Sequence, residues 1–203
     1  LVLRVAVAAA EYGLPIAPGT LRNLKKCPIG DRNWTDESRE LFIRLLASGP
    51  ALLNVWEDID FIDVPGKLIP EWLGVRNRPS ASAAHRYTID RHMVEVVTRL
   101  GRETPSGGRY DDRHYEALLL AGILHDIGKR PGVANHAAEG ARHATVVVER
   151  MGFDRDIVRW VTLLVREHLT LSEFATGRNP NDPNVGDDLA GRLDHNPVLL
   201  DML

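Results

Sequence analysis

The stretch ALLLAGILHDIGK, from Ala117 to Lys129, indicates the fold more clearly than any other part of the sequence. Its apolar residues up to Leu124 form the longest uninterrupted apolar run of the chain. The run is far shorter than the roughly 20 residues that span a bilayer. We therefore predict a helix over residues 113–129 that is buried on most sides.

A His-Asp pair, His125-Asp126, ends this predicted helix. A carboxylate directly after an apolar run is costly to bury unless it is paired or coordinates an ion. Adjacent helical residues point about 100° apart, so both side chains can reach one ion beside the helix. The alternative is that the pair only marks the polar end of a helix, where the helix dipole favours a histidine.

Helical periodicity continues on both sides of this stretch, while alternating strand patterns are nearly absent and aromatic residues make up only 6% of the chain. We therefore predict an all-α fold. Prolines and glycines favour an irregular connector over residues 63–84, a loop over 101–112 and a turn over 179–183. Two short helices are expected near the C-terminus, and the main helices are predicted over residues 1–12, 35–47, 50–62, 88–100, 113–129, 136–151 and 157–169.

Composition limits the classes of protein to which the chain can belong. Of its 203 residues, 44% are hydrophobic and 26% are charged, which is typical of globular domains and excludes disordered, collagen-like and disulfide-rich chains. A single cysteine, Cys27, favours a reducing compartment, so we expect a cytoplasmic protein. The net charge of −3 without a long basic run argues against nucleic-acid binding, and nothing indicates a membrane partner. Because the chain begins at Leu1 instead of Met, we expect a fragment of a longer protein.

Three further histidines could join His125-Asp126 at one site. His168 continues the apolar stripe of its helix and His92 lies at the edge of another inward face, while His136 opens a helix. Each has an ordinary explanation, either a hydrogen-bonded core histidine or, for His136, a solvated residue or helix cap. Helical bundles nevertheless build metal sites from side chains on facing helices. We therefore predict a metal site from these residues, and interpret the remaining histidines as surface or supporting residues, namely His85, His114, His143 and His195.

Several motifs resemble the HD superfamily of metal-dependent phosphohydrolases. They are HDIGK together with flanking segments PEWLGVRNRP (Pro70–Pro79), HRYTIDRH (His85–His92), NHAAEGA (Asn135–Ala141) and LVREHL (Leu164–Leu169). The flanks resemble the HD region of bifunctional PII uridylyltransferase/uridylyl-removing enzymes, in an actinobacterial form that in some members adenylylates PII instead.

This resemblance implies an HD-domain helical bundle over residues 85–203, preceded by a helical annex and connector over residues 1–84. It implies a phosphodiesterase that removes UMP or AMP from a tyrosine of the PII nitrogen-regulatory protein, within a bifunctional enzyme. The implied partners are PII and its nucleotidyl-tyrosine. The substrate-binding residues stay unassigned, and the implied metal ligands are His92, His125, Asp126, His136 and His168.

Within that resemblance, Asp126 is the expected bridging or orienting carboxylate. Lys129 is expected either to hold a phosphate oxygen or only to act as a cation at a helix C-terminus. Imidazole and carboxylate ligands suit Mn, Fe, Co, Ni or Zn, with Mg as a further alternative. The family's last ligand is an Asp beyond Leu203, and Asp201 is not at the matching position. Two other functions stay open, an HD hydrolase of a free nucleotide or alarmone, and a non-catalytic helical module.

Overall fold

The computed structural model describes residues 1–29, 34–80, 87–103, 109–179 and 182–203. These residues form helices and turns without a β-strand, and one isolated antiparallel bridge joins Pro79 to Thr88. The all-α prediction is therefore confirmed. In chain order the elements are α1 (Val2–Tyr12), α2 (Pro18–Leu24), α3 (Asp36–Leu46), α4 (Ala51–Phe61), α5 (Val64–Leu68), the 3-10 helix η1 (Pro70–Gly74), α6 (Ile89–Glu103), α7 (Asp112–Leu124), α8 (His136–Met151), α9 (Arg155–Glu167), α10 (Thr170–Gly177), α11 (Pro183–Arg192) and α12 (Pro197–Met202).

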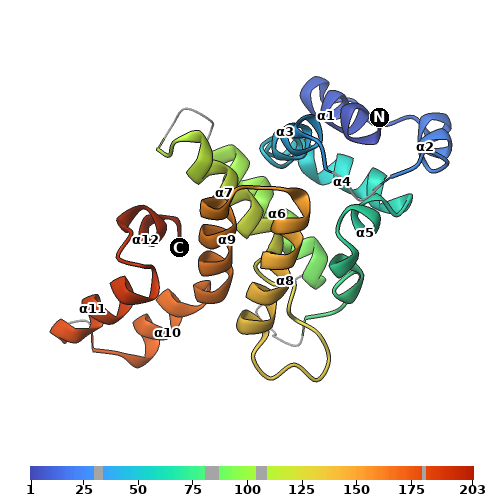
Figure 1. The fold of residues 1–203 in the computed structure, drawn as a ribbon. Coiled ribbons are helices and arrows are strands. Elements are labelled where there is room, and N and C mark those ends of the chain that lie inside the picture. Colours follow the sequence, from blue (N-terminus) through green and yellow to red (C-terminus); the bar gives the residue numbers. More distant parts are fainter. Residues whose placement is uncertain (30–33, 81–86, 104–108, 180–181) are drawn as a thin grey trace.

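The centre of the molecule is a bundle of α6, α7, α8 and α9 (Figure 1). Helix α7 packs against α6 and α9, and α9 also packs against α8. Helices α1, α3 and α4 pack together at one end, where α3 and α4 contact the bundle, and α10 to α12 lie at the other end. One hydrophobic core joins the N-terminal helices to the bundle. The predicted domain boundary at residue 84 lies outside the described residues.

Local sequence signals explain where the bundle helices begin and end. The side chains of Asp111, Asn135 and Asp154 accept backbone N–H groups at the first turns of α7, α8 and α9. Gly152 ends α8 in the left-handed conformation, with φ of 80°, which a glycine adopts without steric cost. These caps fix the register of the helices that carry the histidines.

The predicted irregular connector is partly wrong, because the structure has α5 and η1 within it. Both begin with a proline in their first turn, Pro65 and Pro70, as does α2 with Pro18. Proline is favoured at this position because its missing N–H is not needed there. Helix α6 also continues beyond the predicted end at Leu100.

The end of α7 and the C-terminal region also differ from prediction. Helix α7 stops at Leu124 and the chain turns at His125–Gly128, instead of continuing as a helix to Lys129. Three short helices, α10, α11 and α12, follow α9 where two were expected. Of the predicted turn over 179–183, residues 180–181 lie outside the described part. No helix in the described ranges has the length and apolar character needed to cross a membrane.

Candidate metal centre

Asp126 lies at the middle of the site, in the turn that follows α7. Its side chain is almost fully buried, with 2% exposed, and Oδ2 accepts a hydrogen bond of 2.7 Å from Nζ of Lys129. Helix α7 ends at Leu124, two residues before Asp126. A buried carboxylate of this kind requires compensation by positive charge or by coordination.

Four imidazoles surround this carboxylate, each from a different part of the bundle. The Nε2 atoms of His92 and His125 lie 3.9 and 3.4 Å from Oδ2 of Asp126. The Nε2 atoms of His136 and His168 lie 3.8 and 3.5 Å from Oδ1. The structure thus brings together all five residues for which a metal-ligating role was predicted, and it adds Lys129 to the same cluster.

The outer nitrogens of two rings define their orientation. Nδ1 of His125 lies 2.8 Å from the carbonyl oxygen of Gly122, and Nδ1 of His168 lies 2.8 Å from that of Val165. A carbonyl only accepts, so Nδ1 carries the proton in each case. In the neutral ring Nε2 then presents its lone pair to Asp126. Metal-binding histidines are held in this way, with the outer N–H bonded to a carbonyl.

Unsatisfied atoms at the centre provide a test of whether a metal fits. Oδ1 of Asp126 and Nε2 of His136 and of His168 are buried and have no hydrogen-bond partner among the described residues. Acceptor atoms that face one another without a proton between them repel, and burial makes this costly. A cation among them would satisfy all three, so the residues present fit a metal ion.

The donor atoms fall into two overlapping groups that share Asp126. One group is His92, His125 and Asp126, and the other is Asp126, His136 and His168. Within each group the potential ligand atoms lie within 4.8 Å of one another. Each group could hold a cation, and Asp126 belongs to both. Imidazole nitrogens with a carboxylate favour a transition metal or zinc over calcium.

The pKa values of Asp126 and His136 are shifted in directions that favour cation binding. Burial alone would raise the pKa of the Asp126 carboxyl, but His125, His168 and Lys129 hold it well below its usual range. Burial lowers the pKa of His136, and this effect together with the positive charge of Lys129 outweighs the negative charge of Asp126, which raises it. The carboxylate is therefore ionised and His136 neutral at pH 7, which are the forms that bind metals.

A close backbone approach sets the position of His136. A Cβ added at Gly128 would lie 2.2 Å from the carbonyl oxygen of His136 and 2.3 Å from the nitrogen of Gly140. Only glycine allows the turn after Asp126 to lie against the first turns of α8. The glycine of HDIGK, Gly128, is therefore required by the close packing of this turn against α8.

The remaining histidines lie apart from the centre. His114 stacks on Trp160 at 4.2 Å, and His195 is exposed. His143 is buried, with its Nε2 atom 3.0 Å from Glu139, so it is not a surface residue. His85 lies outside the described residues.

Asp201, near the C-terminus, points away from the centre. Its carboxylate accepts a hydrogen bond of 2.8 Å from the hydroxyl of Tyr110, and it also pairs with Arg109. Asp201 belongs to neither donor group of the centre.

Three cavities adjoin the centre. One of them, of about 460 Å³, reaches His136 and is lined by Arg166, Glu167, Glu173 and Arg192. The other two share no lining residue with each other. The first, of about 340 Å³, is mainly apolar and reaches His92, His125 and His168. The second, of about 480 Å³, reaches Lys129 and His136 and contains the side chains of Arg78 and Arg130. Sequence reasoning left both arginines unassigned, because neither lies on a helical stripe and the fold alone brings them to the site.

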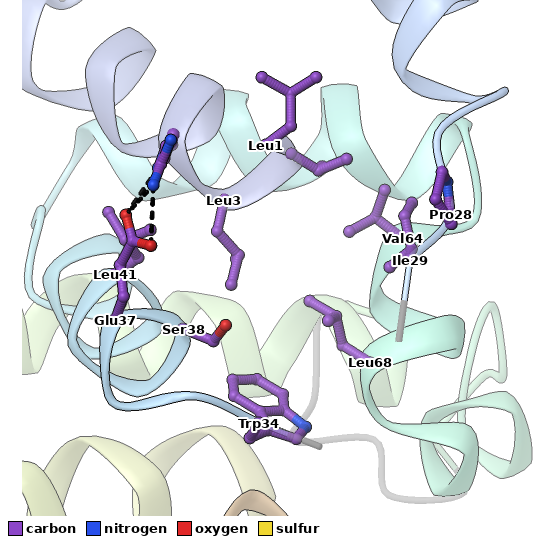
Figure 2. Close-up of a pocket in the computed structure, with 12 residues that line it drawn as sticks. Leu1, Leu3, Pro28, Ile29, Trp34, Glu37, Ser38, Leu41, Val64 and Leu68 are labelled. Atoms are coloured by element: carbon purple, nitrogen blue, oxygen red, sulfur yellow. Dashed lines mark hydrogen bonds and ion pairs between the residues drawn. The ribbon is translucent and has the colours of Figure 1, made fainter. Parts of the chain in front are cut away.

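A further cavity, of about 350 Å³, lies between α1, α3 and α5 (Figure 2). Its walls include the apolar side chains of Leu3, Trp34 and Leu68 and the polar ones of Arg4, Glu37 and Ser38. An ion pair between Arg4 and Glu37 closes one side, with contacts of 2.6 and 2.8 Å. This cavity shares no residue with the metal centre.

Comparison with known proteins identifies relatives along the whole chain. A bifunctional uridylyltransferase/uridylyl-removing enzyme of Mycobacterium tuberculosis is 36% identical over 204 residues, which cover 100% of this chain and 24% of the relative. A Streptomyces coelicolor protein of the same name is 39% identical over 184 residues, covering 89% of this chain and 21% of the relative. A third, from Corynebacterium glutamicum, is 31% identical over 204 residues, covering 99% and 28%.

The chain therefore spans about a quarter of the length of the curated relatives it matches. No family model and no solved structure matches it.

Proposed function

Since this chain is homologous to one segment of bifunctional uridylyltransferase/uridylyl-removing enzymes, we propose that it is the segment that removes the nucleotidyl group. In this proposal it is an HD-type, metal-dependent phosphodiesterase of the cytoplasm. Its substrate is UMP or AMP esterified to a tyrosine of PII. The observation that carries the proposal is the convergence of four imidazoles on buried Asp126. Several of these potential metal-ligand atoms have no hydrogen-bond partner among the described residues.

The residues that would hold the metal follow from the two donor groups. His92 and His125 would bind on the Oδ2 side of Asp126, and His136 and His168 on the Oδ1 side. When bound, a divalent cation supplies a Lewis acid that activates water and offsets the charge that develops at phosphorus. Mn, Fe, Co or Zn suit this donor set, and Mg is a further alternative.

Lys129 and Asp126 contribute charge and orientation. Lys129 is held 2.7 Å from Asp126, so its ammonium group remains at the centre, within reach of a phosphate oxygen bound beside the carboxylate. The negative charge of Asp126 attracts a bound cation, and this attraction would hold the cation between the imidazoles.

The leaving group of the proposed reaction is a tyrosine phenolate, which needs little protonation by a general acid. A tyrosine phenolate leaves readily because the pKa of its parent phenol is about 10. Among the described residues, the two cavities that reach His125 or Lys129 are lined by no Asp or Glu, and the third, which reaches only His136 of the centre, is lined by Glu167 and Glu173. Asp126 is ionised, so it cannot donate a proton. Cleavage of an aryl ester of phosphate does not require a general acid.

The test uses PII modified with UMP or AMP and the Mn²⁺-loaded protein. We expect release of the nucleoside monophosphate, with a loss of at least about 100-fold in Asp126→Asn, since this change removes a shared ligand. Asp187→Asn is the matched control, because Asp187 is exposed and has no described partner. Hydrolysis of dNTPs or guanosine tetraphosphate, with modified PII left intact, would overturn the PII assignment. No hydrolysis of any of these compounds would favour the non-catalytic alternative.

A further inference from the structure

We propose that the largest cavity beside the centre binds the nucleoside arm of the substrate together with its phosphate, and that Arg78 and Arg130 bind the phosphate oxygens. The inference rests on the proposed function and assigns an orientation to its substrate. A phosphodiester has two arms on one phosphorus, here a nucleoside and an aryl group. The largest and the smallest of the cavities beside Asp126 differ in chemistry in a way that distinguishes these arms.

The largest cavity has the composition of an anion site. Three cationic side chains line it, Arg78, Lys129 and Arg130, and no carboxylate does so among the described residues. The rest of its lining is mostly apolar, with Ile89 and Val133, and also includes Ser80 and His136. Its volume of about 480 Å³ lies within the range of small-molecule sites, roughly 300–1,000 Å³. A phosphate beside the cations and a base against the apolar wall would both find suitable surroundings.

Arg130 is held in place before any ligand binds. Its Nη2 atom donates a hydrogen bond of 2.7 Å to the carbonyl oxygen of Glu71 in η1. The carboxylate of Glu71 is fixed in turn by Arg150 of α8, through contacts of 2.8 and 2.6 Å. Nε of Arg130 is buried without a hydrogen-bond partner among the described residues. The arginine therefore offers an oriented charge whose donors are not all used.

Arg78 has a fixed backbone and an uncommitted side chain. Its carbonyl oxygen accepts a hydrogen bond of 2.8 Å from the backbone nitrogen of Ile89 at the start of α6. Its side chain is exposed and has no hydrogen-bond or ion-pair partner in the described part of the chain. An arginine can bind two phosphate oxygens with its planar fork, and Arg78 can do so without breaking another contact.

The cavity is continuous with the metal centre through shared residues. Lys129 and His136 line it, and they lie 2.7 and 3.8 Å from the carboxylate of Asp126. A phosphate bound near Lys129 would therefore lie next to the metal ligands.

The smallest cavity matches the other arm. It is lined by aliphatic side chains such as Val96, Leu118 and Leu164, and by histidines of the centre, without an Arg or Lys among the described residues. Placing a charged phosphate there would cost desolvation energy, whereas a tyrosyl ring would gain from burial.

The experiment is titration calorimetry of UMP and AMP, with uridine and adenosine as ligands that lack the phosphate. Arg78→Gln and Arg130→Gln should each lower the affinity for the monophosphates about tenfold, the effect of one lost charge-assisted contact. Arg78→Lys should retain part of the affinity because it keeps the charge. Arg155→Gln is the control, since Arg155 is exposed and lines neither cavity. The affinity for Mn²⁺ should be unchanged in every variant.

Equal monophosphate affinity in wild type, Arg78→Gln and Arg130→Gln would overturn the inference. The proposed function is tested separately, because product binding does not require turnover. Arg78-dependent binding of UMP without cleavage of modified PII would leave the phosphate site standing and contradict the function. Cleavage of modified PII with an unchanged KM in both variants would support the proposed function and contradict the phosphate site.

Discussion

Nε2 of His168 lies 3.5 Å from Oδ1 of Asp126, and neither buried atom has a hydrogen-bond partner in the described part of the protein. Nδ1 of His168 faces the carbonyl oxygen of Val165 at 2.8 Å, so the proton of the neutral ring lies on Nδ1 and Nε2 is an acceptor. Two acceptors therefore face each other in a buried site. This arrangement is unfavourable as it stands and becomes favourable when a cation lies between them.

The first prediction concerns which histidine matters for metal binding. His168→Ala should lower Mn²⁺ affinity at least about tenfold, because it removes a ligand with a fixed orientation. His114→Ala and His195→Ala should leave the affinity close to that of the wild type, since His114 stacks on Trp160 and His195 is exposed. Calorimetry or electron paramagnetic resonance measures the affinities, and equal losses in all three variants would refute the assigned ligand set.

The second prediction concerns pH. Burial lowers the pKa of His136, and the pKa of Asp126 is held well below its usual range, so the centre keeps its metal-binding form at pH 7. Below the ordinary histidine pKa of about 6.5, protons compete with the metal for imidazole nitrogen. Mn²⁺ affinity should therefore be retained at pH 7 and fall steadily toward pH 5. A constant affinity across this interval would mean that imidazoles do not bind the ion.

The third prediction concerns the turn that carries Asp126. Gly128→Ala should lower the free energy of unfolding by about 2–3 kcal/mol, because its Cβ would overlap backbone atoms of His136 and Gly140. Gly177→Ala is the control, since nothing lies within 4 Å of its added Cβ. Urea denaturation measures both, and a Gly128→Ala variant as stable as wild type would show that the turn does not lie against α8 as described.

The fourth prediction concerns Cys27. Its Sγ atom contacts the carbonyl oxygen of Asn23, 3.5 Å away, in the region after α2, and it belongs to neither donor group of the centre. Alkylation of Cys27 should therefore leave metal-dependent hydrolysis unchanged. Loss of hydrolysis after modification of this thiol alone would reveal a catalytic role that the structure does not indicate.

Several features could be predicted from sequence because one local pattern determined each of them. The stripe that includes Leu164 and His168 indicated the inward face of α9, and Asp154 indicated its start. Asp126 stood out because a charge directly follows an apolar run. These signals pointed to His168 and Asp126, whereas His92 and His136 each had an ordinary alternative explanation and gained support from the resemblance to the HD superfamily.

Other features depended on contacts between distant segments. The end of α7 before His125 depends on how closely Gly128 lies to α8, which periodicity does not reveal. Pro65 and Pro70 were interpreted as helix breakers although they begin short helices. Arg130 reaches its cavity only because η1 lies against it, and the burial of His143 depends on its surroundings in the fold.

The most direct test of the central claim is a crystal structure of the protein soaked in Mn²⁺, with data collected at the manganese absorption edge. We predict an anomalous peak bound to Asp126 and to Nε2 of His168 or His125. A map with no anomalous peak near Asp126, at Mn²⁺ concentrations that saturate the protein in solution, would contradict the account.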